Sequence, residues 1–178
     1  RLSDCRFAGN RASVGGGLGI RTSAVIVERC FFADNQAQHA SWTGGGGIWC
    51  RASTGAVTDC TFIGNTAYSV ELPGDGGGLF SERSYLEVSG CTFANNATGA
   101  GGGGFYSVDQ DSSRITDCHF TENVAAWGGA AFLEHSLATL ARCTFVGNTS
   151  SSGAGAMETI GGNNALLDCE FVANTTAS

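Results

Sequence analysis

Lysine is absent from this chain of 178 residues, and proline and methionine occur only once each. All nine basic residues are therefore arginines; with 16 acidic residues they give a net charge of −7, and they form no basic cluster. Proteins that bind nucleic acid need a concentrated positive surface, so we do not expect nucleic acid or an anionic membrane surface as a partner.

Long apolar runs are also missing. No run approaches the roughly 18 residues of a membrane span, so we predict no transmembrane segment. The first residues, RLSDCRF, contain neither an initiator methionine nor a signal peptide, and we expect residues 1–178 to be one β-helix segment of a longer chain. Short spacings such as Cys-x-x-Cys do not occur, which predicts no metal site and no cofactor.

Glycine is abundant, with 28 residues. The glycines follow no Gly-X-Y period, which excludes collagen, and regularly spaced apolar residues argue against disorder. The glycines must therefore serve a backbone geometry that other residues cannot adopt.

A repeat accounts for this composition. Seven cysteines recur at a mean spacing of about 27 residues, and we expect one coil to begin near each of them: Cys5, Cys30, Cys60, Cys91, Cys118, Cys143 and Cys169. A phenylalanine follows each cysteine two residues later: Phe7, Phe32, Phe62, Phe93, Phe120, Phe145 and Phe171. An asparagine follows five residues after each cysteine: Asn10, Asn35, Asn65, Asn96, Asn123, Asn148 and Asn174.

Each of the first six asparagines is followed by a glycine-rich run, from which the next cysteine is always 13 or 14 residues away. The segment between the asparagine and the glycines varies instead. It is longest in the second and third repeats, at residues 37–43 (AQHASWT) and 68–75 (YSVELPGD). Insertions therefore gather at one corner of two neighbouring repeats.

These units predict an all-β fold, a right-handed parallel β-helix of about seven coils. A unit of this length is too short for a helix pair, and its glycine run opposes helix formation. Three short strands per coil, stacked about 4.8 Å apart, would give a rod roughly 34 Å long. The handedness follows from the rule for parallel crossover connections.

Equivalent residues of successive coils should then form ladders. We expect Cys and Phe, two apart on one strand, to fill the core, and Asn to bond to its equivalents at a buried corner. The residue before each Cys should face outward, where alternating Asp and Arg form either a surface ion-pair ladder or a charged recognition stripe. Parallel side chains favour free thiols over disulfides. Cys50 lies outside the ladder and is either a free thiol or paired with a partner chain.

The pattern Cys-x-Phe-x-x-Asn-x-Ala followed by a glycine run resembles the polymorphic outer membrane protein repeat, known for its Phe-x-x-Asn and Gly-Gly-Ala-Ile tetrapeptides. The first is met by segments such as FIGN and FVGN, and the second by GGGL, GGGI and GGAA. The resemblance implies a right-handed, pectin-lyase-like β-helix. It also implies an extracellular or outer-membrane-associated passenger segment, often exported as an autotransporter and used in adhesion.

The two insertions supply the candidate ligand-binding residues, because they occupy the same corner of neighbouring coils. Aromatic and acidic side chains together suit carbohydrate binding; the alternative is a variable loop exposed to solvent. Trp127, at the same corner, is expected to pack. The candidate ligand-binding residues are His39, Trp42, Tyr68, Glu71 and Asp75.

We therefore predict a structural or adhesive surface rod without enzyme activity, whose loops 37–43 and 68–75 contact another protein or a carbohydrate. No residue is predicted to be catalytic. A polysaccharide lyase or hydrolase is the competing hypothesis, since many parallel β-helices have such activities, although only the long loops break the repeat. A third hypothesis is an extracellular filament, in which copies stack end to end at uncapped coils.

Overall fold

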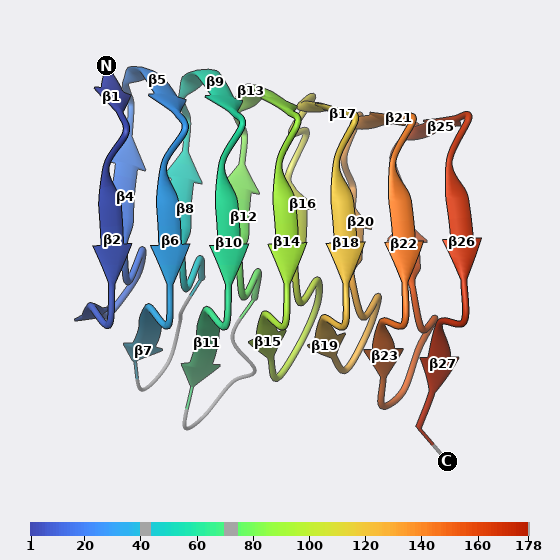
Figure 1. The fold of residues 1–178 in the computed structure, drawn as a ribbon. Helices are drawn as coiled ribbons and strands as arrows, with labels where there is room; N and C mark the ends of the chain where they lie inside the picture. The colour runs from blue at the N-terminus through green and yellow to red at the C-terminus, as the bar shows by residue number, and fades with distance from the viewer. Residues whose placement is uncertain (40–43, 70–74, 178) are drawn as a thin grey trace.

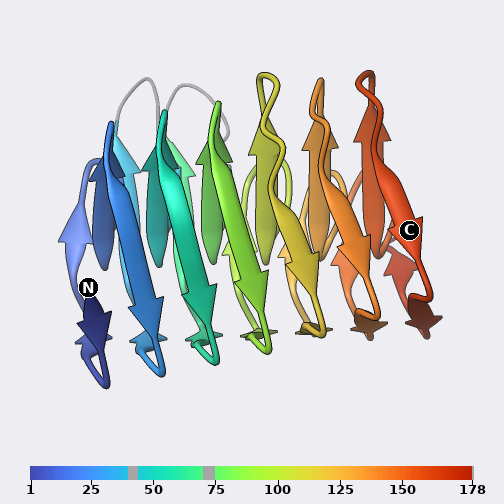
Figure 2. The same cartoon turned by 90° about the horizontal axis from the view of Figure 1, so that it is seen from above.

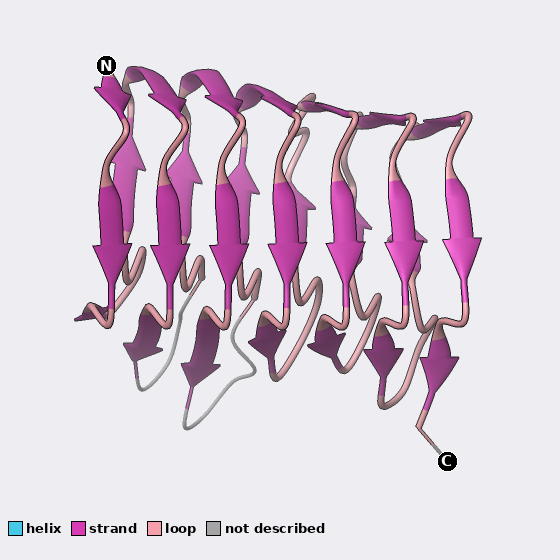
Figure 3. Cartoon of the chain, viewed as in Figure 1, coloured by secondary structure: helices cyan, strands magenta, loops and turns pink. Residues whose placement is uncertain are grey.

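The computed structural model describes residues 1–39, 44–69 and 75–177, and these form one right-handed parallel β-solenoid (Figure 1). The chain descends along the near face, ascends along the far face and advances steadily from the N-terminal coil to the C-terminal coil. Seen from above, the coils stack side by side with little offset (Figure 2). Every regular element among the described residues is a strand (Figure 3).

Four sheets run the length of the stack, each with all its strands parallel. Sheet A contains β1 (Leu2–Ser3), β5 (Ala24–Glu28), β9 (Thr54–Thr58), β13 (Tyr85–Ser89), β17 (Arg114–Thr116), β21 (Thr139–Ala141) and β25 (Ala165–Leu167). Sheet B contains β2 (Arg6–Ala8), β6 (Phe31–Ala33), β10 (Thr61–Ile63), β14 (Thr92–Ala94), β18 (His119–Thr121), β22 (Thr144–Val146) and β26 (Glu170–Val172).

The other two sheets complete each coil. Sheet C contains β3 (Arg11–Ala12), β7 (Gln36–His39), β11 (Thr66–Ser69), β15 (Ala97–Thr98), β19 (Val124–Ala125), β23 (Thr149–Ser150) and β27 (Thr175–Thr176). Sheet D contains β4 (Leu18–Arg21), β8 (Ile48–Arg51), β12 (Leu79–Glu82), β16 (Phe105–Val108), β20 (Ala131–Glu134) and β24 (Met157–Ile160).

The predicted parallel β-helix is confirmed, with two corrections. Sheet D has six strands where the others have seven, so the chain makes six complete turns and part of a seventh, rather than seven coils. Each complete turn contains four strands, and the prediction of three was wrong. The extra corner lies at the residue before each cysteine, whose φ lies between 49° and 61° in all seven repeats. This left-handed conformation breaks the strand, so the cysteine precedes the sheet B strand that carries the phenylalanine.

A left-handed residue also precedes each ladder asparagine and several serines at the corner between sheets D and A, including Ser23 and Ser53. Such a bend turns the next amide N–H out of the strand ladder, and a buried N–H needs another acceptor. The side chain of the equivalent residue in the following coil supplies it. Cys30 N donates to Cys60 Sγ at 3.4 Å, Asn35 N to Asn65 Oδ1 at 3.1 Å, and Ser23 N to Ser53 Oγ at 3.1 Å. The same bond therefore closes three corners of the coil.

The asparagines add two further bonds. Asn65 Nδ2 donates to Asn96 Oδ1 at 3.0 Å and to the carbonyl of Phe32 at 2.9 Å. Five of the seven asparagines are fully buried with this arrangement: Asn35, Asn65, Asn96, Asn123 and Asn148. Each one thus ties three successive coils together.

Inside these corners, the phenylalanine rings form one continuous stack. Neighbouring ring centroids lie 4.7–4.9 Å apart, and the ring planes differ by only 3–5°. All eight cysteines are free thiols, and the ladder thiols also donate to backbone, as Cys60 Sγ does to the carbonyl of Thr58 at 3.2 Å. Cys50 is fully buried with its Sγ 3.7 Å from Ser84 Oγ, which excludes pairing with a partner chain in the folded state.

Glycine is required at the remaining corner because the backbones of adjacent coils meet there. Gly45 has φ +64°, and a Cβ on its neighbour Gly46 would lie 2.4 Å from the carbonyl oxygen of Gly77. No other residue fits such a contact, since real Cβ atoms do not approach other atoms below 3.0 Å. The glycine runs therefore set the short, constant path into sheet D.

The asparagine ladder can be tested by truncation. We expect Asn65→Ala to lower the free energy of unfolding by about 1–3 kcal/mol, because it leaves buried partners in both neighbouring coils unsatisfied. Urea denaturation measures the change. Asn10→Ala is the matched control: Asn10 occupies the same ladder but is exposed, and we expect a smaller loss. Equal stability of Asn65→Ala and the unsubstituted chain would contradict the role assigned to the ladder.

Candidate functional site

The outer face of sheet D carries an unusual column of large aromatic residues. Leu79 and Phe105 point into the core, so the residues that follow them, Phe80 and Tyr106, point outward. Four such residues pack together as a second cluster: Trp49, Phe80, Tyr106 and Phe132. Although they lie outside the β-helix core, they are only 3–6% exposed. Other residues must therefore cover them.

The cover comes from the column of residues directly before the left-handed glycines, which are Val14, Gly44, Asp75, Gly101 and Trp127. Its backbone is fixed by bonds between coils, such as Gly76 N to Gly101 O and Gly102 N to Trp127 O, both 3.0 Å. A Cβ at Gly101 would lie 2.1 Å from the ring of Phe132. The ring of Phe132 thus occupies the space that a side chain at Gly101 would need, between Asp75, one coil earlier, and Trp127, one coil later.

Two adjoining pockets occupy this surface, and together we call them the sheet D groove. The Trp127 pocket has a volume of about 400 Å³ and is lined by Asp75, Ala100, Gly101, Tyr106, Trp127, Phe132, Glu134 and Ile160. The Arg51 pocket has a volume of about 360 Å³ and is lined by Arg51, Asp75, Phe80, Glu82, Tyr106, Val108 and Asp109. Asp75 and Tyr106 belong to both, at the centre of the groove.

The carboxyl group of Asp75, at the centre of the groove, is destabilised in its charged form. Burial raises the pKa of Asp75 to about 7, and the negative charge of Glu134 adds to the increase, while the amide of Gly101, which donates to Asp75 Oδ1 at 3.2 Å, opposes it. The Tyr106 hydroxyl donates to Glu134 Oε2. Burial and the neighbouring carboxylates raise the pKa of Tyr106, so the phenol stays protonated at neutral pH.

The two pockets differ in charge. In the Arg51 pocket, Arg51 Nε lies 3.1 Å from Glu82 Oε2, so opposite charges pair. A second arginine, Arg83, bridges Glu82 at 3.0 Å and Asp109 at 2.9 Å. The described residues that line the Trp127 pocket include two carboxylates and no arginine. Negative charge is thus compensated at one end of the groove and not at the other.

Of the predicted ligand-binding residues whose side chains the structure describes, Asp75 lies in the groove and Tyr68 does not. Tyr68 is 46% exposed on β11 and lines neither pocket. The backbones of His39 and Ser69 pair between β7 and β11, but the side chain of His39 lies outside the described part of the chain, as do Trp42 and Glu71 entirely. The structure brings Asp75 together with residues of sheet D rather than with Tyr68.

Sequence reasoning missed Tyr106 and Glu134, and it expected Trp127 to pack, whereas Trp127 is 40% exposed at the pocket rim. The sequence contained a signal for this covered surface. Large aromatic residues recur directly after the apolar residue that follows the glycine run, at positions that face outward. Polar residues are usual at outward positions of a strand, so this column indicated a covered surface.

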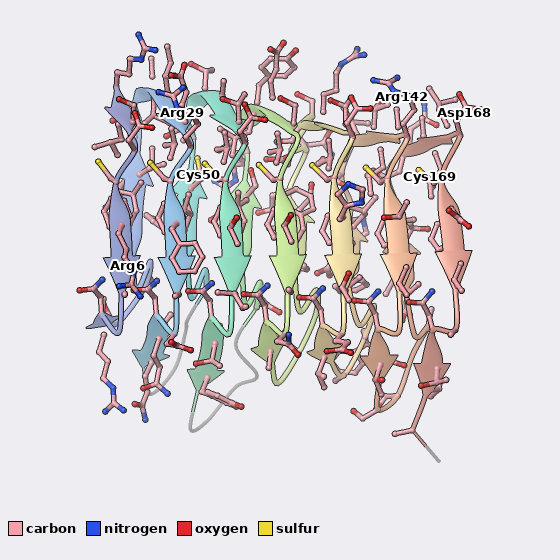
Figure 4. The ribbon with its side chains drawn as sticks, viewed as in Figure 1. Arg6, Arg29, Cys50, Arg142, Asp168 and Cys169 are labelled. Carbon is pink, nitrogen blue, oxygen red and sulfur yellow. The ribbon has the colours of Figure 1, made fainter. Side chains whose placement is uncertain are left out.

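The charged column before the cysteines lies at the corner between sheets A and B, away from the groove. It contains exposed ion pairs between arginine and aspartate. Arg29 makes two bonds of 2.8 Å to Asp4, and Arg142 makes two of 2.8 Å to Asp117, which lowers the pKa of each aspartate through the hydrogen bond to its arginine. Figure 4 shows Arg29, Arg142 and Asp168 along one edge, above the row of sulfur atoms. Each arginine bonds the aspartate of the preceding coil, as in an ion-pair ladder.

Two further classes of site concern residues 1–39, 44–69 and 75–177. No group of three or more His, Cys, Asp or Glu side chains is placed to hold a metal ion. In the same residues, no helix is long and apolar enough to cross a membrane.

The third repeat of the chain matches a known repeat family. Residues 59–82 match the Chlamydia polymorphic membrane protein repeat. The match begins at the left-handed Asp59, includes Cys60, Phe62 and Asn65, and ends with β12. The resemblance to the polymorphic membrane protein repeat is thereby confirmed, on one of the seven copies. No curated protein and no solved structure matches the chain.

The pKa of Asp75 predicts how stability depends on pH. An aspartate in an unfolded chain has a pKa of about 3.9, so between roughly pH 4 and pH 7 the folded state binds more protons than the unfolded state. Stability should therefore fall as the pH rises through this range, by at most about 4 kcal/mol for this group.

We expect Asp75→Asn to flatten this slope and to be more stable than the unsubstituted chain at pH 8, as measured by urea denaturation at pH 5 and pH 8. Asp59→Asn, at an exposed carboxylate, should keep the slope. Parallel pH profiles for Asp75→Asn and the unsubstituted chain would show that Asp75 is not buried in its neutral form.

Proposed function

We propose that this β-helix is a structural, adhesive rod at a cell surface, and that the sheet D groove and the adjoining loops 37–43 and 68–75 contact its partner. The observation that carries the proposal is the position of the groove. Asp75 ends the second insertion, and Gly101 and Trp127 follow in the same column. Among the described residues, these departures from the repeat line a hollow that combines the exposed ring of Trp127 with two carboxylates and no arginine.

The rest of the molecule supports a display role. Its corners and core are occupied by side-chain ladders that run the length of the stack, which hold the groove residues at fixed intervals. A solenoid of this kind presents extended surfaces built from neighbouring coils. The matched repeat comes from a family of membrane proteins, which agrees with a place at the outer membrane or another exposed surface.

A second function is favoured by the protonation state of Asp75. A carboxyl group with a pKa of about 7 near a second carboxylate, Glu134, has the composition of an acid and base pair for glycoside hydrolysis. If the chain acts on a polysaccharide, we expect Asp75→Asn to abolish the release of reducing sugars, with Asp59→Asn unaffected. Absence of any release by the unsubstituted chain across neutral and acidic polysaccharides would exclude this alternative.

Adhesion tests the main proposal directly. Beads coated with the full chain should adhere to cultured epithelial cells, and we expect Trp127→Ala to reduce the number of adherent beads at least threefold, because the exposed indole forms the rim of the pocket. Tyr85→Ala is the matched control: Tyr85 is also an aromatic residue with 40% exposure, but it lies on sheet A.

Two results would contradict the proposal. Beads coated with the unsubstituted chain that adhere no better than uncoated beads would exclude an adhesive role for this segment. Equal losses for Trp127→Ala and Tyr85→Ala would place the contact elsewhere than the sheet D groove. Circular dichroism of both variants should match that of the unsubstituted chain, since both side chains are exposed.

A further inference from the structure

The Trp127 pocket has a composition that specifies the chemistry of its ligand. Three aromatic side chains form its floor and rim, and two carboxylates, Asp75 and Glu134, lie at its edges. Among the described lining residues there is no positive group to balance them. Aromatic faces and carboxylates attract the same kind of ligand, an organic cation.

We propose that the Trp127 pocket binds a guanidinium group, presented by an arginine side chain of the partner protein. This inference rests on the proposed adhesive function and names the chemistry of its contact. The planar guanidinium would stack on the exposed face of Trp127 and donate two hydrogen bonds to the carboxylate of Asp75.

The spacing of the coils suits a flat group. Asp75 and Trp127 flank Gly101 in one column, so their Cα atoms are two coils apart, roughly 10 Å. The N–H donors of a guanidinium lie in its plane, so a group that stacks on the indole of Trp127 can turn its edge toward the carboxylate of Asp75 across this distance. Gly101 has no side chain to stand between Asp75 and Trp127, and the ring of Phe132 fills the space beneath it as the floor of the pocket.

Hydrogen-bond acceptors distinguish guanidinium from other cations. A quaternary ammonium has no N–H to donate, and it would leave the carboxylate of Asp75 desolvated without a bond. Glu134 already accepts the hydroxyl of Tyr106, which fixes that carboxylate at the pocket edge. Among the described residues, the carboxylate of Asp75 accepts a hydrogen bond from the backbone amide of Gly101 at Oδ1, and its two oxygens suit a ligand with paired donors.

The protonation of Asp75 couples binding to pH. Its near-neutral pKa reflects burial without a cationic neighbour in contact, so a bound guanidinium should compete with the proton. The charged and titratable groups that face it come from several elements of the groove: Glu134 on β20, Tyr106 on β16, Asp109 after β16, Glu82 on β12 and Arg51 on β8. Arg51 is already bridged to Glu82, so Asp75 is the group expected to titrate.

The test uses the full chain and three capped tripeptides, Ac-Gly-X-Gly-NH2, where X is arginine, lysine or citrulline. Citrulline keeps the shape of arginine without its charge. NMR titration, followed at the indole N–H of Trp127, should give at least tenfold tighter binding of the arginine peptide than of the citrulline peptide, with lysine between them. With a pKa of about 7, the charged fraction of Asp75 rises about tenfold from pH 6 to pH 8, and the affinity should rise similarly.

Two variants and one control make the assignment specific. Asp75→Asn should weaken arginine binding at least tenfold and remove its pH dependence, and Trp127→Phe should weaken it while keeping a ring at the rim. Asp59→Asn, on an exposed corner, should bind as the unsubstituted chain does. Equal binding of the arginine and citrulline peptides, or undiminished binding to Asp75→Asn, would overturn the proposal. Tighter binding of choline than of the arginine peptide would overturn it in favour of a quaternary ammonium ligand.

Failure of this inference can be told apart from failure of the adhesive role. If coated beads adhere in a Trp127-dependent manner but the arginine peptide neither binds nor competes, the groove is adhesive and its ligand is not a guanidinium. A neutral oligosaccharide that blocks adhesion in that case would identify a carbohydrate partner. If the arginine peptide binds with the expected pH dependence and beads do not adhere, the pocket chemistry holds and the adhesive function is wrong.

Discussion

The structure depends on one kind of hydrogen bond, which recurs along the whole stack at the Asn corner and also forms at the Cys and Ser corners of the N-terminal coils. A residue in the left-handed conformation turns the chain and leaves the next amide N–H without a strand partner, and a side chain of the following coil accepts it. Sulfur, amide oxygen and hydroxyl oxygen serve this purpose at the Cys, Asn and Ser corners, respectively. Because a buried N–H without an acceptor is strongly unfavourable, this bond determines which residues can follow each bend.

Several features follow from that constraint. The acceptor must come from an equivalent residue, so the repeat has to stay in register over the whole stack, and the rings of Phe62 and Phe93 are held parallel at 4.7 Å. Since the fourth corner has no such side chain, it is closed by glycines whose backbones nearly touch. That corner can vary in length before the glycines without disturbing the ladders. The covering column and the sheet D groove lie on this side of the coil.

Much of this fold can be predicted from the sequence, because each ladder consists of one residue type that recurs at a constant offset within the repeat. The seven Cys, Phe and Asn positions predict a parallel β-helix, and the glycine run marks a crowded corner. The number of strands per coil was not predicted, since Asp4, Arg29 and Asp59 carry no local signal that their φ is positive. Their varied side chains suggested an outward strand position rather than a bend.

The site was less predictable than the fold. Asp75 was found because it belongs to an insertion, but its neighbours in space, Tyr106 and Glu134, lie one and two coils further along the chain. Their position at one pocket depends on glycine at position 101, where the neighbouring coils have Asp75 and Trp127, and this variation is not periodic. The repeat predicts the residues that are common to every coil. The groove depends instead on Asp75, Gly101 and Trp127, which differ between three neighbouring coils.

Amide hydrogen exchange measured by NMR tests the central claim most directly. If side chains of the following coil accept the corner amides, then the N–H groups of Asn35, Asn65 and Asn96 should exchange as slowly as those of the adjacent sheet B strands, Phe32, Phe62 and Phe93. The same protection should extend to the amides of Cys30 and Cys60. Corner amides that exchange at rates typical of exposed turns, while the strand amides stay protected, would contradict the account.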